Sequence, residues 1–96
     1  MWPFAKPKFK REGGRGGQFK YSDGDRRAEL EWEMLVGDDF DLVVYGDACR
    51  WTAPDPRQMT KDEVRYLVRE LVAETRLRVD LAFSDGSEDM RPNSAV

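Results

Sequence analysis

The chain of 96 residues is predicted to fold as one α+β domain, in which a single helix packs on the apolar face of a mainly antiparallel sheet of about four strands. Three observations predict this class. Two alternating apolar-polar segments flank an Asp-Gly pair, a third alternating segment follows, and a helical apolar stripe precedes a last alternating segment. The predicted order is ββ-β-α-β. A second hydrophobic core would need a much longer chain.

The domain is expected over residues 18–83. Before it, residues 1–17 are interpreted as a flexible basic arm, because the sequence EGGRGG at residues 12–17 has four glycines in six residues and predicts a hinge. After it, residues 84–96 have little apolar content and no periodicity, which predicts a disordered C-terminal tail. The chain therefore divides into arm, domain and tail.

The first two strands of the domain are expected to meet at Asp23 and Gly24, a pair typical of a two-residue hairpin turn. With Ser22 opposite Asp25, Phe19 lies opposite Ala28. This register gathers the apolar side chains of both strands on one face. They are Phe19, Tyr21, Ala28, Leu30, Trp32 and Met34.

The third strand is expected from Phe40 to about Ala48, after a turn at residues 37–39. Placing Met34 opposite Phe40 sets Trp32 opposite Leu42, so a third apolar row joins the same face. A slip of one residue would set that row opposite glutamates, and burial forbids it. The apolar residues of the three strands are thus expected on one buried face.

The helix is expected after Pro54 and Pro56, which cannot donate ladder hydrogen bonds and so end the sheet pattern. Thr60 fits the N-cap and Glu63, three residues later, completes a capping box. An apolar stripe follows over about 15 residues. Its members are Val64, Leu67, Val68, Leu71 and Val72. The last strand alternates Leu77, Val79, Leu81 and Phe83 with polar or small residues.

Composition excludes several classes of function. The chain has no histidine and one cysteine, Cys49, so zinc sites, disulfide frameworks and histidine-based catalysis are excluded. Arg50 could lower the pKa of the Cys49 thiol, but the sequence assigns no base to it. No apolar run approaches the roughly 18 residues of a membrane span. We therefore expect no catalytic residue, no cofactor, no metal site and no transmembrane segment.

The face of the sheet away from the helix is expected to be acidic. Its candidate partner-binding residues are Glu29, Glu31, Glu33, Asp41 and Tyr45, while Val43, Arg78 and Asp80 share the face. The expected register sets Asp41 opposite Glu33, an unfavourable pair of like charges that suits a surface made for a basic partner. Two alternatives remain open. The face could simply be solvated, or Val43, Tyr45 and Cys49 could form a homodimer or ligand patch.

The N-terminal arm carries the second candidate surface. Residues 1–20 hold six basic residues against one acidic residue, whereas residues 21–96 hold ten against eighteen. Aromatic and basic side chains interleave in the arm, a combination that suits an anionic membrane or a nucleic-acid backbone. The candidate contacts are Trp2, Phe4, Lys6, Lys8, Lys10 and Arg11. Pro3 and Pro7 oppose a helix there, so the contact would use an extended segment.

The order of elements is similar to that of many small bacterial α+β domains, including some toxin-immunity proteins, and such a resemblance of architecture does not fix function. The sequence therefore predicts a small non-catalytic interaction module, immunity-like or adaptor-like, whose acidic sheet face docks a basic protein partner. The alternative is a peripheral binder of anionic membrane or nucleic acid through the arm. A cytoplasmic location is expected, because no secretory signal is visible and a lone cysteine suits a reducing compartment.

Overall fold

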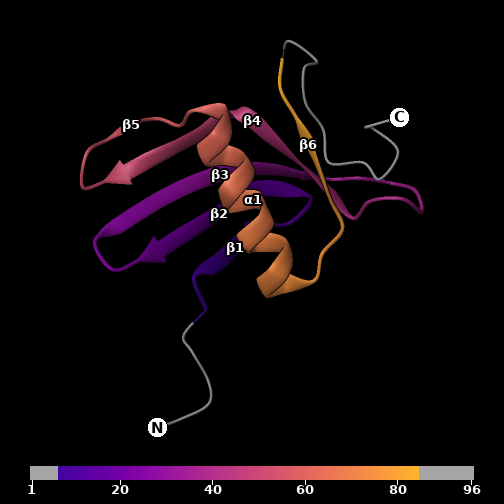
Figure 1. Cartoon of the computed structure of the whole chain (residues 1–96). Coiled ribbons are helices and arrows are strands. Elements are labelled where there is room, and N and C mark those ends of the chain that lie inside the picture. Colours follow the sequence, from indigo (N-terminus) through magenta and orange to yellow (C-terminus); the bar gives the residue numbers. More distant parts are fainter. Residues whose placement is uncertain (1–6, 85–96) are drawn as a thin grey trace, which may run out of the picture.

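A computed structural model describes residues 7–84 of the chain. Within this range one sheet of six strands carries a single helix across one face (Figure 1). The elements are β1 (Phe9–Gly13), β2 (Gly16–Asp23), β3 (Arg26–Met34), β4 (Leu42–Ala53), β5 (Arg57–Gln58), α1 (Lys61–Thr75) and β6 (Val79–Ala82). The α+β class with a mainly antiparallel sheet and one helix is confirmed, but the expected number of about four strands is too low.

Strand order explains how the sheet is assembled. The strands run β1-β2-β3-β4-β5 in antiparallel pairs, and β6 pairs in parallel with the first half of β4. A parallel pair needs a crossover connection, and α1 is part of that connection. The additional strand β5, opposite Arg50 and Trp51, lies between the prolines and the helix, where the sequence pattern indicated no strand. β5 thus gives the second half of β4 a second neighbouring strand, as β6 does for the first half.

The other additional strand, β1, lies in the segment expected to be a flexible arm. Phe9 is buried in the core and lies opposite Tyr21 of β2. Gly13 has φ 102°, and a Cβ there would approach the carbonyl oxygen of Gly16 to 2.0 Å. The glycines at residues 13–17 therefore build a tight hairpin turn, which corrects the expectation of a hinge. Residues 1–6, including Trp2, Phe4 and Lys6, and residues 85–96 of the expected tail lie outside the described range.

The register of the central strands differs from expectation by two residues. Asp23 pairs with Arg26, so Gly24, with φ 62°, and Asp25 form the turn. Phe19 consequently lies opposite Leu30 rather than Ala28, and Trp32 lies opposite Val44 rather than Leu42. A shift of two residues leaves every side chain on its face, so the predicted apolar face is correct although the pairs are wrong.

The core lies between this face and α1. Trp32 and Phe19 are its largest fully buried side chains, and the Trp32 indole Nε1 donates a hydrogen bond of 3.2 Å to the carbonyl of Glu12. The helix contributes four fully buried residues of the predicted stripe. They are Val64, Leu67, Val68 and Leu71. Met34, expected in this core, is 47% exposed because it ends β3.

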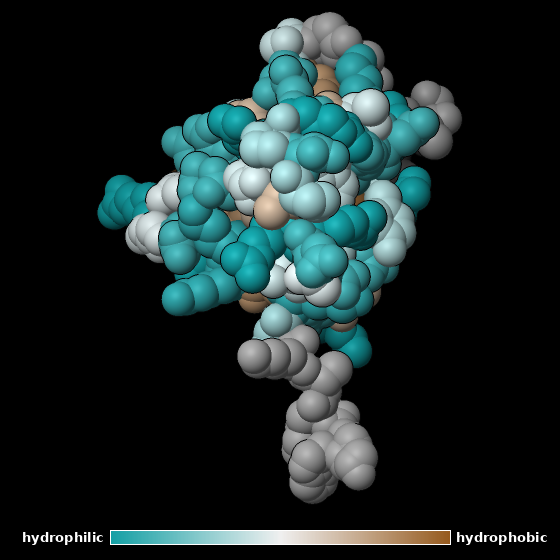
Figure 2. All heavy atoms as spheres, turned by 90° about the vertical axis from the view of Figure 1, so that its left-hand side faces the viewer, coloured by the Kyte–Doolittle hydropathy of each residue, from teal (hydrophilic) through white to brown (hydrophobic). Residues whose placement is uncertain are grey.

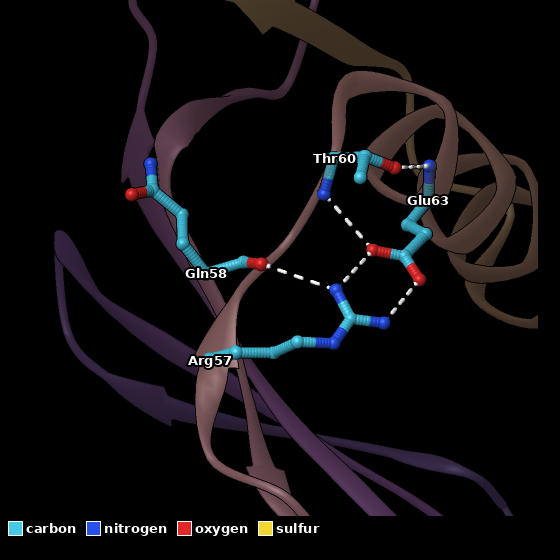
Figure 3. A network of polar contacts seen from close by, with 4 residues as sticks. All are labelled: Arg57, Gln58, Thr60 and Glu63. Atoms are coloured by element: carbon cyan, nitrogen blue, oxygen red, sulfur yellow. Dashed lines mark hydrogen bonds and ion pairs between the residues drawn. The ribbon is translucent and has the colours of Figure 1, made fainter.

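The start of α1 follows the predicted capping box (Figure 3). The Thr60 side chain accepts from the backbone N–H of Glu63 at 3.2 Å, and the Glu63 carboxylate accepts from the Thr60 N–H at 2.9 Å. The same carboxylate accepts two hydrogen bonds from the Arg57 guanidinium, at 2.8 and 2.7 Å. The helix end is tied down as well, because Glu74 accepts from the N–H groups of Lys8 and Phe9. Across residues 7–84 no helix is long and apolar enough to cross a bilayer.

Candidate functional site

The face of the sheet away from α1 has two halves of opposite charge. Residues directly opposite each other on neighbouring strands share a face, so the register defines cross-strand rows. One row is Lys10, Lys20, Glu29 and Arg50, and the next is Glu12, Gln18, Glu31 and Tyr45. On β3, Arg27 lies beyond the first row and Glu33 beyond the second. We call Lys10, Lys20, Arg27 and Arg50 the basic half, and Glu12, Glu31 and Glu33 the acidic half.

The acidic half contains a shallow hollow of about 400 Å³. Its lining residues are Glu12, Gly13, Gly17, Gln18 and Glu31. Gln18 stands between the two carboxylates, since it lies opposite Glu12 on one side and Glu31 on the other. Within residues 7–84 neither carboxylate forms an ion pair with a lysine or arginine. The hollow therefore presents two negative charges and an amide to solvent.

Tyr45 borders this half. It is half-buried on β4, lies opposite Glu31, and donates its hydroxyl hydrogen to Oε1 of Glu33. The hydrogen bond to the Glu33 carboxylate raises the pKa of Tyr45, with burial adding to the effect. The phenol thus stays protonated and holds the Glu33 carboxylate at its hydroxyl group.

Two of the predicted partner-binding carboxylates are already paired with cations. Lys20 Nζ lies 2.5 Å from Oε2 of Glu29, and this contact raises the pKa of Lys20. Arg78 holds Asp41 through its guanidinium at 3.0 Å and through its backbone N–H at 2.8 Å. The Arg78 side chain lowers the pKa of Asp41 accordingly. These contacts leave Glu31 and Glu33 as the predicted acids most open to a partner.

The prediction that Asp41 lies opposite Glu33 is wrong. Val43 takes that place, as a result of the two-residue difference in register, and Asp41 precedes β4. Val43 and Asp80 lie next to each other on this face and are buried, with exposures of 6% and 5%. The edge of the face at β6 is therefore covered, contrary to the expectation of a wet surface there.

The alternative patch of Val43, Tyr45 and Cys49 is not assembled. Glu31 lies opposite Tyr45 and Glu29 opposite Arg50, so four residues of β4 bulge against one residue of β3. Cys49 lies in this bulge with its side chain in the core, and burial raises the pKa of its thiol to about 12. A second shallow hollow of about 350 Å³ lies at the bulge, beside Asp47, Arg50 and Gln58.

One surface feature was missed by the sequence reasoning. Met34, Leu35 and Val36 form an exposed apolar run at the end of β3, and Val36 is fully exposed. Met34 ends β3, and the β3–β4 connection, which contains Leu35 and Val36, projects at the right of Figure 1. Figure 2 views the opposite end, which holds the β2–β3 turn and the β4–β5 connection and is mostly hydrophilic. The sequence signal is that Leu35 and Val36 lie just before Gly37, outside the expected strands, whereas Met34 was assigned to a strand.

Comparisons with protein-family models, with curated proteins and with solved structures give no match. Among residues 7–84, no group of three or more cysteine, aspartate or glutamate side chains is arranged to hold a metal ion. The shape and charge of the surface therefore carry the functional proposal.

Proposed function

We propose that this chain is a small non-catalytic protein-interaction module, which docks a basic segment of a protein partner on its acidic half. The observation that carries the proposal is the hollow between Glu12 and Glu31, where two carboxylates flank the amide of Gln18. A lysine or arginine side chain of a partner would make charge-assisted hydrogen bonds there, which are roughly twice as strong as neutral ones. Glu29 and Asp41 take no part, because Lys20 and Arg78 neutralise them.

Tyr45 supplies the aromatic part of the docking surface. Tyr45 lies opposite Glu31, which lines the hollow, and its hydroxyl is bonded to Glu33, so the side chain is fixed before a partner arrives. Fixed aromatic residues beside charged groups are frequent hot spots of protein interfaces, because little conformational entropy is lost on binding. An approaching guanidinium can stack on this ring while it bonds the carboxylates.

A binding role, rather than catalysis, is supported by the state of the candidate nucleophile. The Cys49 thiol is buried and its raised pKa keeps it protonated at neutral pH. A protonated thiol is a poor nucleophile. The sequence also provides no histidine to act as a base near pH 7.

The test uses a synthetic arginine-rich peptide as a defined basic probe, with calorimetry for affinity and amide chemical shifts for location. Glu31→Lys should weaken binding about tenfold or more, because it replaces an attraction in the hollow by a repulsion. Asp25→Lys is the matched control, since it makes the same change of net charge in the β2–β3 turn. Equal losses of peptide affinity in the two variants would show that only net charge matters. Chemical-shift changes outside β1–β4 would show that the peptide binds elsewhere, and either result would refute the proposal.

The second candidate function is the alternative from the sequence, in which the N-terminal segment binds an anionic membrane or a nucleic acid. Lys10 lies beside Lys20 on the basic half, and this observation favours contact with an anionic membrane or nucleic acid on that side. The test removes residues 1–6 and changes Lys10 and Lys20 to glutamine, because a deletion through residue 17 would also remove β1. Unchanged sedimentation with anionic liposomes and unchanged nucleic-acid gel shifts at low salt would reject it.

A further inference from the structure

The two charged halves are arranged antisymmetrically about one line across the sheet. The register places Arg11, Phe19 and Leu30 side by side on β1, β2 and β3, and this row is the line. On β1, Lys10 and Glu12 lie on either side of it. On β3, Arg27 and Glu33 lie three residues before and three residues after Leu30. Opposite charges thus stand at mirrored positions on both outer strands of this three-strand surface.

Such a pattern is complementary to itself. Two copies of one face can stack about a two-fold axis that lies in the interface, parallel to this line. The rotation keeps each strand over its own copy and reverses its direction. Lys10 then faces Glu12 of the other copy, and Arg27 faces Glu33, each pair occurring twice. An axis along the strands would instead place like-charged rows over each other.

We propose that the basic partner of the acidic half is the basic half of a second copy of this chain, in a homodimer stacked through β1–β3. The inference rests on the proposed function, because it uses the same acidic half. Charge complementarity selects this occupant: a uniformly basic partner would match Glu12 and Glu33 but would be repelled by Lys10 and Arg27. A second copy matches both signs at once.

Glu29 and Glu31 are the exception to the pattern, since they also stand on either side of Leu30 and carry the same charge. Lys20 offsets this repulsion, because its ammonium is 2.5 Å from the Glu29 carboxylate and brings a positive charge next to the position that Glu31 of the other copy takes. Gln18, which mirrors Lys20 on β2, adds no repulsion. The centre of the face therefore keeps one net negative charge per copy, and Lys20 reduces the repulsion between Glu29 and Glu31 without removing it.

The side chains are long enough to meet. Sheets that pack face to face stand about 10 Å apart, a gap that a lysine or arginine reaching toward a glutamate can span. The contact is polar and solvent-accessible at its rim, so we expect a weak association that salt suppresses.

The experiment is sedimentation equilibrium of the full chain at low and at high salt. The wild type should dimerise at low salt, with a dissociation constant that rises about tenfold or more when salt screens the pairs. Lys10→Glu with Arg27→Glu makes all four mirrored positions acidic, and Glu12→Lys with Glu33→Lys makes all four basic. Each double variant should be monomeric. Asp25→Lys with Asp55→Lys, two exposed sites off this face, is the charge-matched control and should still dimerise.

Two recovery measurements complete the design. A variant with all four changes keeps the formal net charge of −3 and places each exchanged pair opposite its complement again, so it should dimerise. An equimolar mixture of the acidic and basic double variants should form a heterodimer. A wild type that stays monomeric at low salt, double variants that still dimerise, or a fourfold variant without recovery would each overturn the inference. Retained binding of the arginine-rich peptide in a monomeric wild type would leave the proposed function standing.

Discussion

Replacing Glu63 tests the contacts that connect β5 to α1. Glu63→Gln keeps an acceptor for the Thr60 N–H, since glutamine also completes a capping box, but it removes the charge that binds Arg57. Glu63→Ala removes both. Taken alone, a pKa lowered from 4.5 to about 2 would correspond to about 3 kcal/mol. The Arg57 side chain is 51% exposed, and solvent screening reduces the ion pair to about 1 kcal/mol.

The expected loss of stability is therefore about 1 kcal/mol for Glu63→Gln and about 2 kcal/mol for Glu63→Ala, which also loses the cap. At about 4–8 °C per kcal/mol for a domain of this size, Glu63→Gln should lower the Tm at pH 7 by that interval. Thermal unfolding followed by circular dichroism measures it. Glu70→Gln, on the same helix, is the control and should leave the Tm nearly unchanged.

The pH dependence has a definite sign. The bonds from Arg57 and from the Thr60 backbone lower the pKa of folded Glu63, so its ionisation stabilises the folded chain in full above about pH 4.5. This contribution is lost as the pH falls toward about 2, where the folded carboxyl takes up its proton. The gap in Tm between wild type and Glu63→Gln should therefore narrow across that interval. A gap that is absent at pH 7, or that stays constant down to pH 2.5, would refute the assignment.

Three further predictions concern other parts of the fold. Gly46→Ala should lower the free energy of unfolding by about 1–3 kcal/mol, because its Cβ would lie 2.2 Å from the Phe83 ring. Gly14→Ala is the control, since a Cβ there meets nothing within 4 Å. Calorimetry of both variants checks this, and equal Tm values would contradict it. Cys49 should react with a thiol reagent at pH 8 only as fast as the fold opens, because its thiol is buried and burial raises its pKa to about 12. Labelling of the folded chain as fast as in denaturant would disprove this prediction. Val36→Asp should change stability by less than about 0.5 kcal/mol because Val36 is fully exposed, and a large drop in denaturant midpoint would show that it packs.

The sequence was informative where one local rule decides the structure. Thr60 and Glu63 fix the start of α1 whatever the rest of the chain does, and helical spacing alone places Leu67 and Leu71 in the core. The faces of β2 and β3 follow from alternation in the same way. These features could be predicted because each depends on neighbouring residues only.

The remaining features depend on contacts between distant parts of the chain. Phe9 offers one apolar residue in a basic segment, and only its burial beside β2 shows that the segment is a strand. Burial of an apolar face cannot tell a register from one shifted by two residues, so Asp41 was placed opposite Glu33. The halves of the open face depend on that register, and they were missed for the same reason.

Register therefore decides the charge pattern more strictly than it decides the core. A shift of two residues between β2 and β3 would keep every apolar side chain on its face, yet it would move each charge about 7 Å along its neighbour. The turn at Gly24 prevents that shift, because its φ of 62° is one that other residues rarely adopt. Gly13, with φ 102°, fixes the β1–β2 register in the same way. Lys10 and Glu12 would lose their mirrored places relative to β3 if either turn moved. Gly13, one of the glycines that first suggested a hinge, thus helps to keep the two charged halves of the open face in place.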